Sequence, residues 1–234
     1  MLNMMKKDLK LASRDGVFLY VMPVLITVCL IIYEISCLYG DDSSDLYRLY
    51  LIPILMNYLS FFIMMVIGTM LMQSLVRIEK ENSVNQVIIS KGVKISDILF
   101  SKIIVVIIIS YAIFLIDYLL MFFCYKLIIK KWIIIPGMAV LRTFVLVPLI
   151  GALYIEVLGA ALWLLRRKEL ALFILELGSM GVLALVIKCE ITGEFTINIS
   201  NILVIVAVAI ALSILLKFII EKVPKEYLVK IETK

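Results

Sequence analysis

The chain contains no histidine in its 234 residues. This absence excludes His-based catalytic triads, His-ligated metal sites and histidine proton relays. No Gly-x-x-x-x-Gly-Lys-Ser/Thr phosphate loop occurs, so the chain cannot bind ATP by that route. A Cys-x-x-Cys pair and a closely paired acidic motif, the usual signs of a metal site, are also lacking. The sequence therefore predicts a protein that is not an enzyme and binds no cofactor itself.

Charged residues are scarce, at 18% of the chain, whereas hydrophobic residues make up 64%. An ordinary soluble domain has about 25% charged and roughly 45–50% apolar residues. Because so few polar residues cannot cover a soluble fold of this length, we predict an integral membrane protein. Its 234 residues suit a single transmembrane domain, residues 1–234. Cysteine is also sparse, and Cys37, Cys124 and Cys189 near the outer ends of spans permit a disulfide without requiring one.

The apolar residues gather in runs of helix length that lack the alternation of barrel strands. The six runs are Val17–Tyr39, Leu51–Val76, Ile103–Tyr125, Met138–Leu165, Leu170–Ile187 and Ile199–Leu216. We therefore predict an all-α fold, a polytopic bundle of six transmembrane helices. The fourth run is roughly 42 Å long as a helix, so it should tilt, or kink near Pro148 and Gly151. The sixth is expected to extend to Ile220.

The distribution of cations predicts the orientation. If the N-terminus lies inside, most of the 23 Lys and Arg residues fall in cytoplasmic segments, as the positive-inside rule requires. We therefore predict a multi-pass protein of the cell membrane (inner or plasma membrane) with both termini in the cytoplasm. The net charge of +5 is explained by this orientation and by anionic lipid headgroups, without a nucleic-acid partner.

Residues 1–16 have the pattern of an amphipathic helix. Leu2, Met5, Leu9 and Ala12 recur at helical spacing, and Lys6, Lys7, Lys10 and Arg14 occupy other faces. Such a helix lies on the inner leaflet with its cations toward the headgroups. An unstructured basic segment that serves only as an orientation signal is the alternative.

The cytoplasmic loop 77–102 is the longest polar stretch. Within it, Val84, Val87 and Ile88 form an apolar stripe at i, i+3 and i+4, after the acidic pair Glu79 and Glu81 that suits a helix N-terminus. So short a helix is marginal alone, so the stripe must be buried against lipid or a partner protein.

Two segments resemble the membrane subunits of type-2 ABC transporters. The first is Lys-Lys-Asp-Leu-Lys-x-x-x-Arg-Asp at 6–15, followed by a span with an early proline. The second is the loop, which is similar to that family's Glu-x-Glu-x-small, hydrophobic turn, Gly break and Ser-x-x-x-x-x-Lys lead into the next helix. The loop positions are Glu79, Glu81, Ser83, Val87, Ile88, Gly92, Ser96 and Lys102. Asn82 departs from the family's usual glycine.

The resemblance implies an ATP-driven exporter. Two such subunits, identical or different, would form the translocation path, and a separate ATP-binding subunit would hold ATP and Mg. The loop would act as a coupling helix between spans 2 and 3, with Val84, Val87 and Ile88 in a groove of the ATPase. Small bacterial members of this size resemble efflux or peptide-antibiotic immunity permeases, so an amphipathic or hydrophobic substrate is implied: a peptide antibiotic, a drug or a lipid-like molecule.

Ionisable groups inside the membrane are costly and point to function. Asp117 and Arg142 are predicted to form a structural ion pair, with substrate contact as the alternative. Glu156, near the midplane, is the best candidate to line the translocation path, and Glu176 is a weaker one. Protonation of Glu156, or its pairing with Arg142, would explain the same carboxyl differently.

Two other classes of function remain open. An ATP-independent carrier or channel would show inverted repeats with broken helices, and the sequence has no clear internal repeat. An intramembrane enzyme needs clustered carboxylates, His or Asn/Asp-rich loops at one face, and the acids of this chain are scattered.

Overall fold

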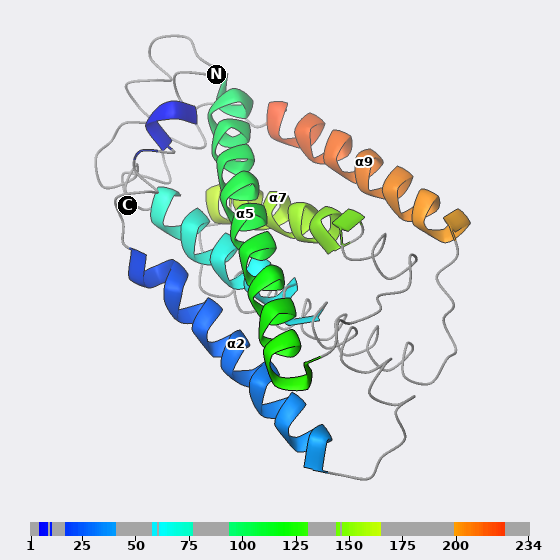
Figure 1. Cartoon of the computed structure of the whole chain (residues 1–234). Helices are drawn as coiled ribbons and strands as arrows, with labels where there is room; N and C mark the ends of the chain where they lie inside the picture. Colours follow the sequence, from blue (N-terminus) through cyan, green and yellow to red (C-terminus); the bar gives the residue numbers. More distant parts are fainter. Residues whose placement is uncertain are drawn as a thin grey trace.

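The structure, a computed structural model, describes residues 5–8, 10, 17–40, 58–59, 61–76, 94–130, 144–145, 147–164 and 199–222. All regular secondary structure in these ranges is helical, which confirms the all-α prediction there (Figure 1). The labelled helices are α2 (Val17–Gly40), α5 (Ile95–Ile129), α7 (Val147–Leu164) and α9 (Ile199–Glu221). A further helix, Phe61–Val76, has no label in the figure and is called helix 61–76.

The helix bounds follow the hydrophobic runs closely. Helix α2 begins at the predicted Val17, and α9 continues past Ile220 as expected. The fourth run is not one uniform helix, because Phe144 and Val145 form a π-helical turn and α7 begins at Val147. Pro148 thus lies in the first turn of α7, a position where proline is tolerated. The fifth run, 170–187, lies outside the described residues.

The start of α5 corrects one predicted boundary. Residues 95–102, assigned to the cytoplasmic loop because of their polar composition, form the first two turns of the 35-residue helix α5. Asp97 in the first turn suits the positive end of the helix dipole. At the other end Lys130 takes a left-handed conformation with φ 59°, and its N–H donates to the Lys126 carbonyl at 2.9 Å. This cap ends the helix.

Helix 61–76 and α7 run parallel in tight register. Gly151 packs against Met64, Ile155 against Gly68, and Gly159 against Met72. Successive contacts are four residues apart on both helices. At each contact a glycine of one helix meets a large side chain of the other, and the glycine comes from α7, then from helix 61–76, then from α7 again. Gly151 and Gly159 therefore mark sites of close helix packing.

Helices α2 and α5 form a second parallel pair. Thr27 bonds to Asp117, and Ile31 packs one turn further on with Tyr118 and Met121. The two pairs run in opposite directions, because Gly68 faces Ser110 of α5 whereas Gly159 faces Ile103.

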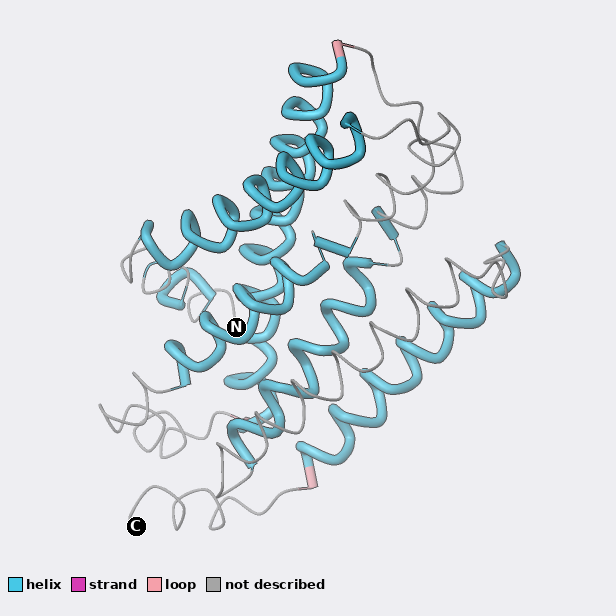
Figure 2. The backbone as a smooth tube through the Cα atoms, turned by 90° about the horizontal axis from the view of Figure 1, so that it is seen from below, coloured by secondary structure: helices cyan, strands magenta, loops and turns pink. Residues whose placement is uncertain are grey.

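Helix α9 completes the described bundle. Its Lys217 ammonium lies 5.9 Å from the ring centroid of Phe100, so α9 ends beside the start of α5. Ile220 of α9 shares the main core with Ile98 and Leu99. Figures 1 and 2 show the helices crossing at varied tilts around α5, which packs against α2, α7 and α9.

The described surface carries many large apolar side chains, and a few polar side chains are buried. Large apolar side chains are exposed along α2, α5 and α9, such as Leu25, Ile116 and Ile214, and most of the exposed face of α9 is of this kind. Side chains such as Asp8, Lys102 and Asp117 are buried. Within the described residues one helix, Ser96–Ile128, is long and apolar enough to cross a membrane, with a mean hydropathy of 2.7 over its best window.

Candidate functional site

Buried polar side chains follow one stripe of α5. Ser96, Ser110 and Asp117 are separated by multiples of seven residues, which places them on the same helix face. Lys102 and Ser101 are buried beside the start of this stripe. Because polar groups in an apolar interior need partners, this stripe identifies where other segments contact α5 through specific bonds.

The first such contact joins α5 to the N-terminal segment. The Lys102 ammonium lies 3.7 Å from Oδ1 of Asp8, and only 1% of the lysine side chain and 3% of the aspartate side chain are exposed. The Ser101 hydroxyl lies 3.4 Å from the other carboxylate oxygen but 2.8 Å from the Ile98 carbonyl. Since a hydroxyl has one proton, the shorter bond to the carbonyl takes most of it. The Lys102 ammonium is thus one of the groups that face the Asp8 carboxylate.

This contact changes the interpretation of residues 1–16. Residues 5–8 are helical, as predicted, and Lys6, Lys7 and Lys10 are exposed. Asp8, in contrast, faces protein, so this part of the segment packs on the start of α5. Lys102, which the sequence places at the end of the cytoplasmic loop, is almost completely buried.

The second contact joins α2 to the middle of α5. The Thr27 hydroxyl donates to Oδ1 of Asp117 at 2.8 Å, and both residues are buried. The same hydroxyl lies 3.0 Å from the Val24 carbonyl and 3.3 Å from that of Pro23. The predicted partner of Asp117, Arg142, lies outside the described residues, so their ion pair stays a prediction.

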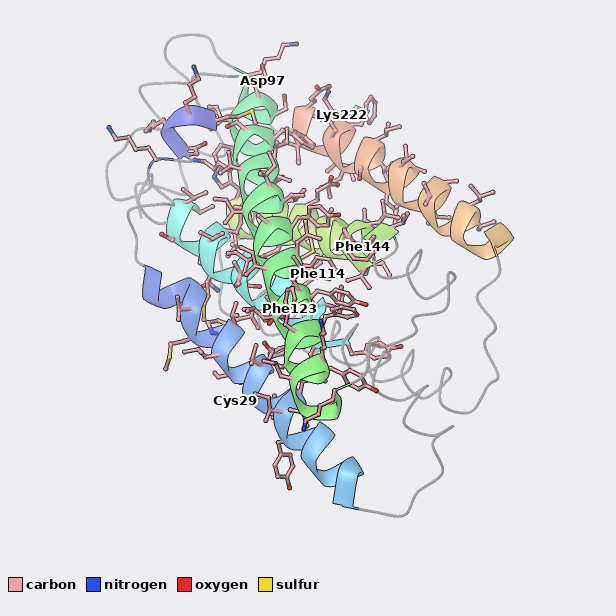
Figure 3. The ribbon with its side chains drawn as sticks, in the orientation of Figure 1. Cys29, Asp97, Phe114, Phe123, Phe144 and Lys222 are labelled. Atoms are coloured by element: carbon pink, nitrogen blue, oxygen red, sulfur yellow. The ribbon has the colours of Figure 1, made fainter. Side chains whose placement is uncertain are left out.

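An aromatic ladder continues from the Asp117 region. Phe114 stacks on Tyr111 and on Tyr118, with ring centroids 5.7 and 6.3 Å apart. Tyr118 meets Phe144 edge to face at 5.4 Å. Phe114 and Phe144 are labelled in Figure 3, where Phe144 reaches α5 from the segment before α7. These rings fix the π-helical turn against the centre of α5.

The third polar contact lies between helix 61–76 and α7. The hydroxyls of Thr69 and Tyr154 are 2.9 Å apart, so one donates to the other. The bond lies within the glycine register, beside Gly68 and Ile155. Both parallel pairs are thus joined by a polar bond as well as by packing.

Glu156 is half-buried in α7, but its Oε2 is fully buried and has no hydrogen-bond partner in the part of the chain that the structure describes. Trp163, seven residues later on the same helix face, is 3% exposed, and its Nε1 is likewise without a partner there. An acceptor and a donor left unsatisfied on one face are unusual in a folded protein. This face can accept a further polar group, from a substrate, a water molecule or another subunit.

Several predicted site residues lie outside the described ranges. They are Glu79, Glu81, Val84, Val87, Ile88, Gly92, Arg142 and Glu176. Sequence reasoning in turn missed Asp8, Thr27 and the Thr69–Tyr154 bond. Asp8 could have been identified as the single acidic residue among the lysines of the N-terminal segment. No sequence signal indicates the contact between Thr69 and Tyr154.

The described residues contain no group of three or more His, Cys, Asp or Glu side chains that could hold a metal. Cys124 is a free thiol. No protein-family model, curated protein or solved structure matches the chain.

Proposed function

We propose that the chain is the membrane-spanning permease subunit of an ATP-driven exporter, powered by a separate ATP-binding subunit. The observation that carries the proposal is the buried Asp8–Lys102 contact. It joins the N-terminal segment to the start of α5, directly after the loop that resembles a coupling helix. The exporter moves an amphipathic or hydrophobic molecule out of the cell or membrane.

The many exposed apolar side chains support the six-span architecture. Exposed side chains such as Leu25 and Ile214 suit lipid contact, because lipid has no hydrogen-bonding partner to offer and requires none. At 1.5 Å per residue, α2 (24 residues) and α9 (23 residues) are each about 35 Å long. The hydrocarbon core of a bilayer is about 30 Å thick, so both helices have sufficient length to cross it.

The helix directions support the same architecture. In a six-span chain, the first and third spans run one way, and the second, fourth and sixth run the other. Helices α2 and α5 are parallel, and helix 61–76 and α7 are parallel to each other and opposite to α5. Helix α9 ends where α5 begins, as a sixth span would.

Glu156 supports a role for α7 in the translocation path. Inside a membrane, an ionisable carboxyl is costly unless it binds something. Its buried Oε2 has no partner in the described part of the chain, so a cationic or hydrogen-bonding group of the substrate fits there.

An affinity pull-down from native membranes tests the function. The full chain, gently solubilised, should bring down an ATP-binding subunit identified by mass spectrometry. Ile88→Asp should abolish this recovery, because a charge would enter the apolar groove. Ile88→Leu is the matched control and should retain it.

Recovery of the chain alone, under conditions that preserve known membrane complexes, would contradict the proposal. A stand-alone carrier or channel, or an intramembrane enzyme, would then be the better description. Equal recovery with Ile88→Asp would leave the ATPase partner in place and refute the coupling role of the loop.

A further inference from the structure

We infer that Glu156 and Trp163 of α7 form a two-point binding site for a ligand that carries a cationic group and, about 10 Å away, a hydrogen-bond acceptor. The inference deepens the proposed function, on which it rests for its place in transport, because it gives the chemistry of the molecule that is moved. The binding itself is a property of this chain and needs no ATP-binding subunit.

Two polar atoms of α7 are buried without a partner. Oε2 of Glu156 and Nε1 of Trp163 are shielded from the surface, and neither has a hydrogen-bond partner among the described residues. A buried polar atom without a partner destabilises a fold, most of all when it belongs to a charged group. Leucine and phenylalanine would fill similar volumes without this cost. The two side chains therefore suit a role in binding better than a role in packing.

The two residues lie on one face of α7. They are seven positions apart, close to two helical turns, so their Cα atoms are about 10 Å apart along the axis. Both Cα–Cβ bonds tilt toward the N-terminus of the helix, so the two side chains leave the backbone in the same direction. Gly159 and Ala160 lie between them on this face and carry no long side chain. One ligand of matching length can thus reach both groups.

The two groups recognise different chemistry. The Glu156 carboxylate accepts hydrogen bonds and attracts a positive charge, so it suits an ammonium or guanidinium group. The Trp163 indole can only donate, so it requires an acceptor such as a carbonyl oxygen. One water molecule cannot bond to both atoms across about 10 Å. Arg142, the alternative partner of Glu156, has no acceptor in its side chain for the indole. A ligand with both groups satisfies the pair.

The surroundings of the site favour an apolar linker between the two groups of the ligand. Trp163 belongs to the main hydrophobic core together with Leu158 and Leu162. Gly159 is packed against Met72 of helix 61–76. The ligand is therefore amphipathic, in agreement with the substrate proposed for the exporter. Because both polar atoms are shielded, it reaches them when packed helices separate, as in a transporter that alternates between two conformations.

Isothermal titration calorimetry of the full chain in lipid nanodiscs tests the site with three small probes. The first is the N,N-dimethylamide of 8-aminooctanoic acid, whose ammonium and carbonyl groups are about 10 Å apart in the extended chain. Octylamine lacks the carbonyl group, and N,N-dimethyloctanamide lacks the cation. Titration into empty nanodiscs gives the heat of partition into lipid, which is subtracted. The aminoamide should bind at least roughly threefold more tightly than either of the other probes.

Two conservative variants separate the two points of contact. Glu156→Gln should weaken binding of the aminoamide roughly tenfold or more, because a charged hydrogen bond is lost, and should leave N,N-dimethyloctanamide unchanged. Trp163→Phe should weaken the aminoamide roughly threefold or more and leave octylamine unchanged, since phenylalanine keeps an aromatic ring but has no N–H. Glu221→Gln is the matched control, because it removes an exposed carboxylate of α9 and should alter none of the affinities. Circular dichroism and gel filtration establish that each variant stays folded.

Equal affinity of the wild type for the aminoamide and octylamine would overturn the two-point site. This comparison needs no variant, so it decides the question even where a substitution prevents folding. An equal loss of octylamine binding in Trp163→Phe would indicate a packing role for the indole and would also overturn the site. If no ATP-binding subunit is recovered with the chain, the proposed function fails, whereas calorimetry still decides the site. If the subunit is recovered but no probe binds, only the site is refuted.

Discussion

Gly159 lies where three helices meet, so its replacement tests the packing of the bundle directly. A Cβ at this position would overlap Cε of Met72 in helix 61–76 and lie 3.2 Å from Cγ1 of Ile103 in α5. Met72 is itself fully buried, so its terminal methyl has little free volume to enter. Gly159→Ala is therefore an overpacking substitution at an otherwise favourable helix position.

Two opposing contributions set the expected magnitude. Alanine is favoured over glycine within a helix by about 1 kcal/mol. Overpacking of a well-packed interior costs typically 1–3 kcal/mol. The net effect should be destabilisation by about 0–2 kcal/mol. In a Met72→Ala background the overlap is gone, so the same change should stabilise the protein by up to about 1 kcal/mol. The coupling between the two sites is then about 1–3 kcal/mol.

The assay is the free energy of unfolding, measured by SDS titration in mixed micelles with circular dichroism, for both single variants and the double variant. Ala211→Gly, at an exposed position of α9, measures the difference in helix propensity between alanine and glycine without a contribution from packing. An equal effect of Gly159→Ala in the two backgrounds would refute the three-helix contact, and with it the parallel register of helix 61–76 and α7.

Three further substitutions address the buried polar groups. Thr27→Val should destabilise the chain by about 0.5–2 kcal/mol because the 2.8 Å bond to Asp117 is lost; Thr27→Ser should recover most of it in the same titration, and an equal loss would point to methyl packing. Ser110→Ala should be neutral or stabilising by up to about 1 kcal/mol, because the buried Ser110 hydroxyl has no partner in the described residues; a clear loss of stability would reveal one. Glu156→Gln should leave the unfolding free energy within about 1 kcal/mol but lower ATP-dependent efflux of ethidium by roughly tenfold, since one charged hydrogen bond contributes about 1.5–3 kcal/mol. Unchanged efflux would make Glu156 a bystander.

Local sequence patterns predicted the helices well. The apolar run of α2 begins and ends almost where the helix does, because length and composition alone indicate a long apolar helix. The predicted start of α5 was wrong, and the reason is physical. Ser96, Ser101 and Lys102 look like loop residues in a sequence, but in the structure they are helical and buried against other segments.

The contacts between helices could not be predicted in the same way. Asp8 and Lys102 are 94 positions apart, and the local sequence around either residue does not indicate that the two are in contact. The few polar residues of α5 do share one face, at Ser96, Ser110 and Asp117, but their spacing alone does not indicate which helix meets that face. The role of Glu156 in the translocation path stays a prediction, to which the structure adds a buried Oε2 without a partner in the described residues.

The 90-residue separation between Thr27 and Asp117 has a consequence for biosynthesis. At a translation rate of about 5–20 residues per second, the ribosome delivers Asp117 roughly 5–20 seconds after Thr27. During that interval the Thr27 hydroxyl can bond to the carbonyls of Val24 and Pro23, which lie 3.0 and 3.3 Å away in its own helix. The nascent α2 therefore carries its own temporary acceptor, and the Thr27 hydroxyl is not left unsatisfied before α5 is synthesised.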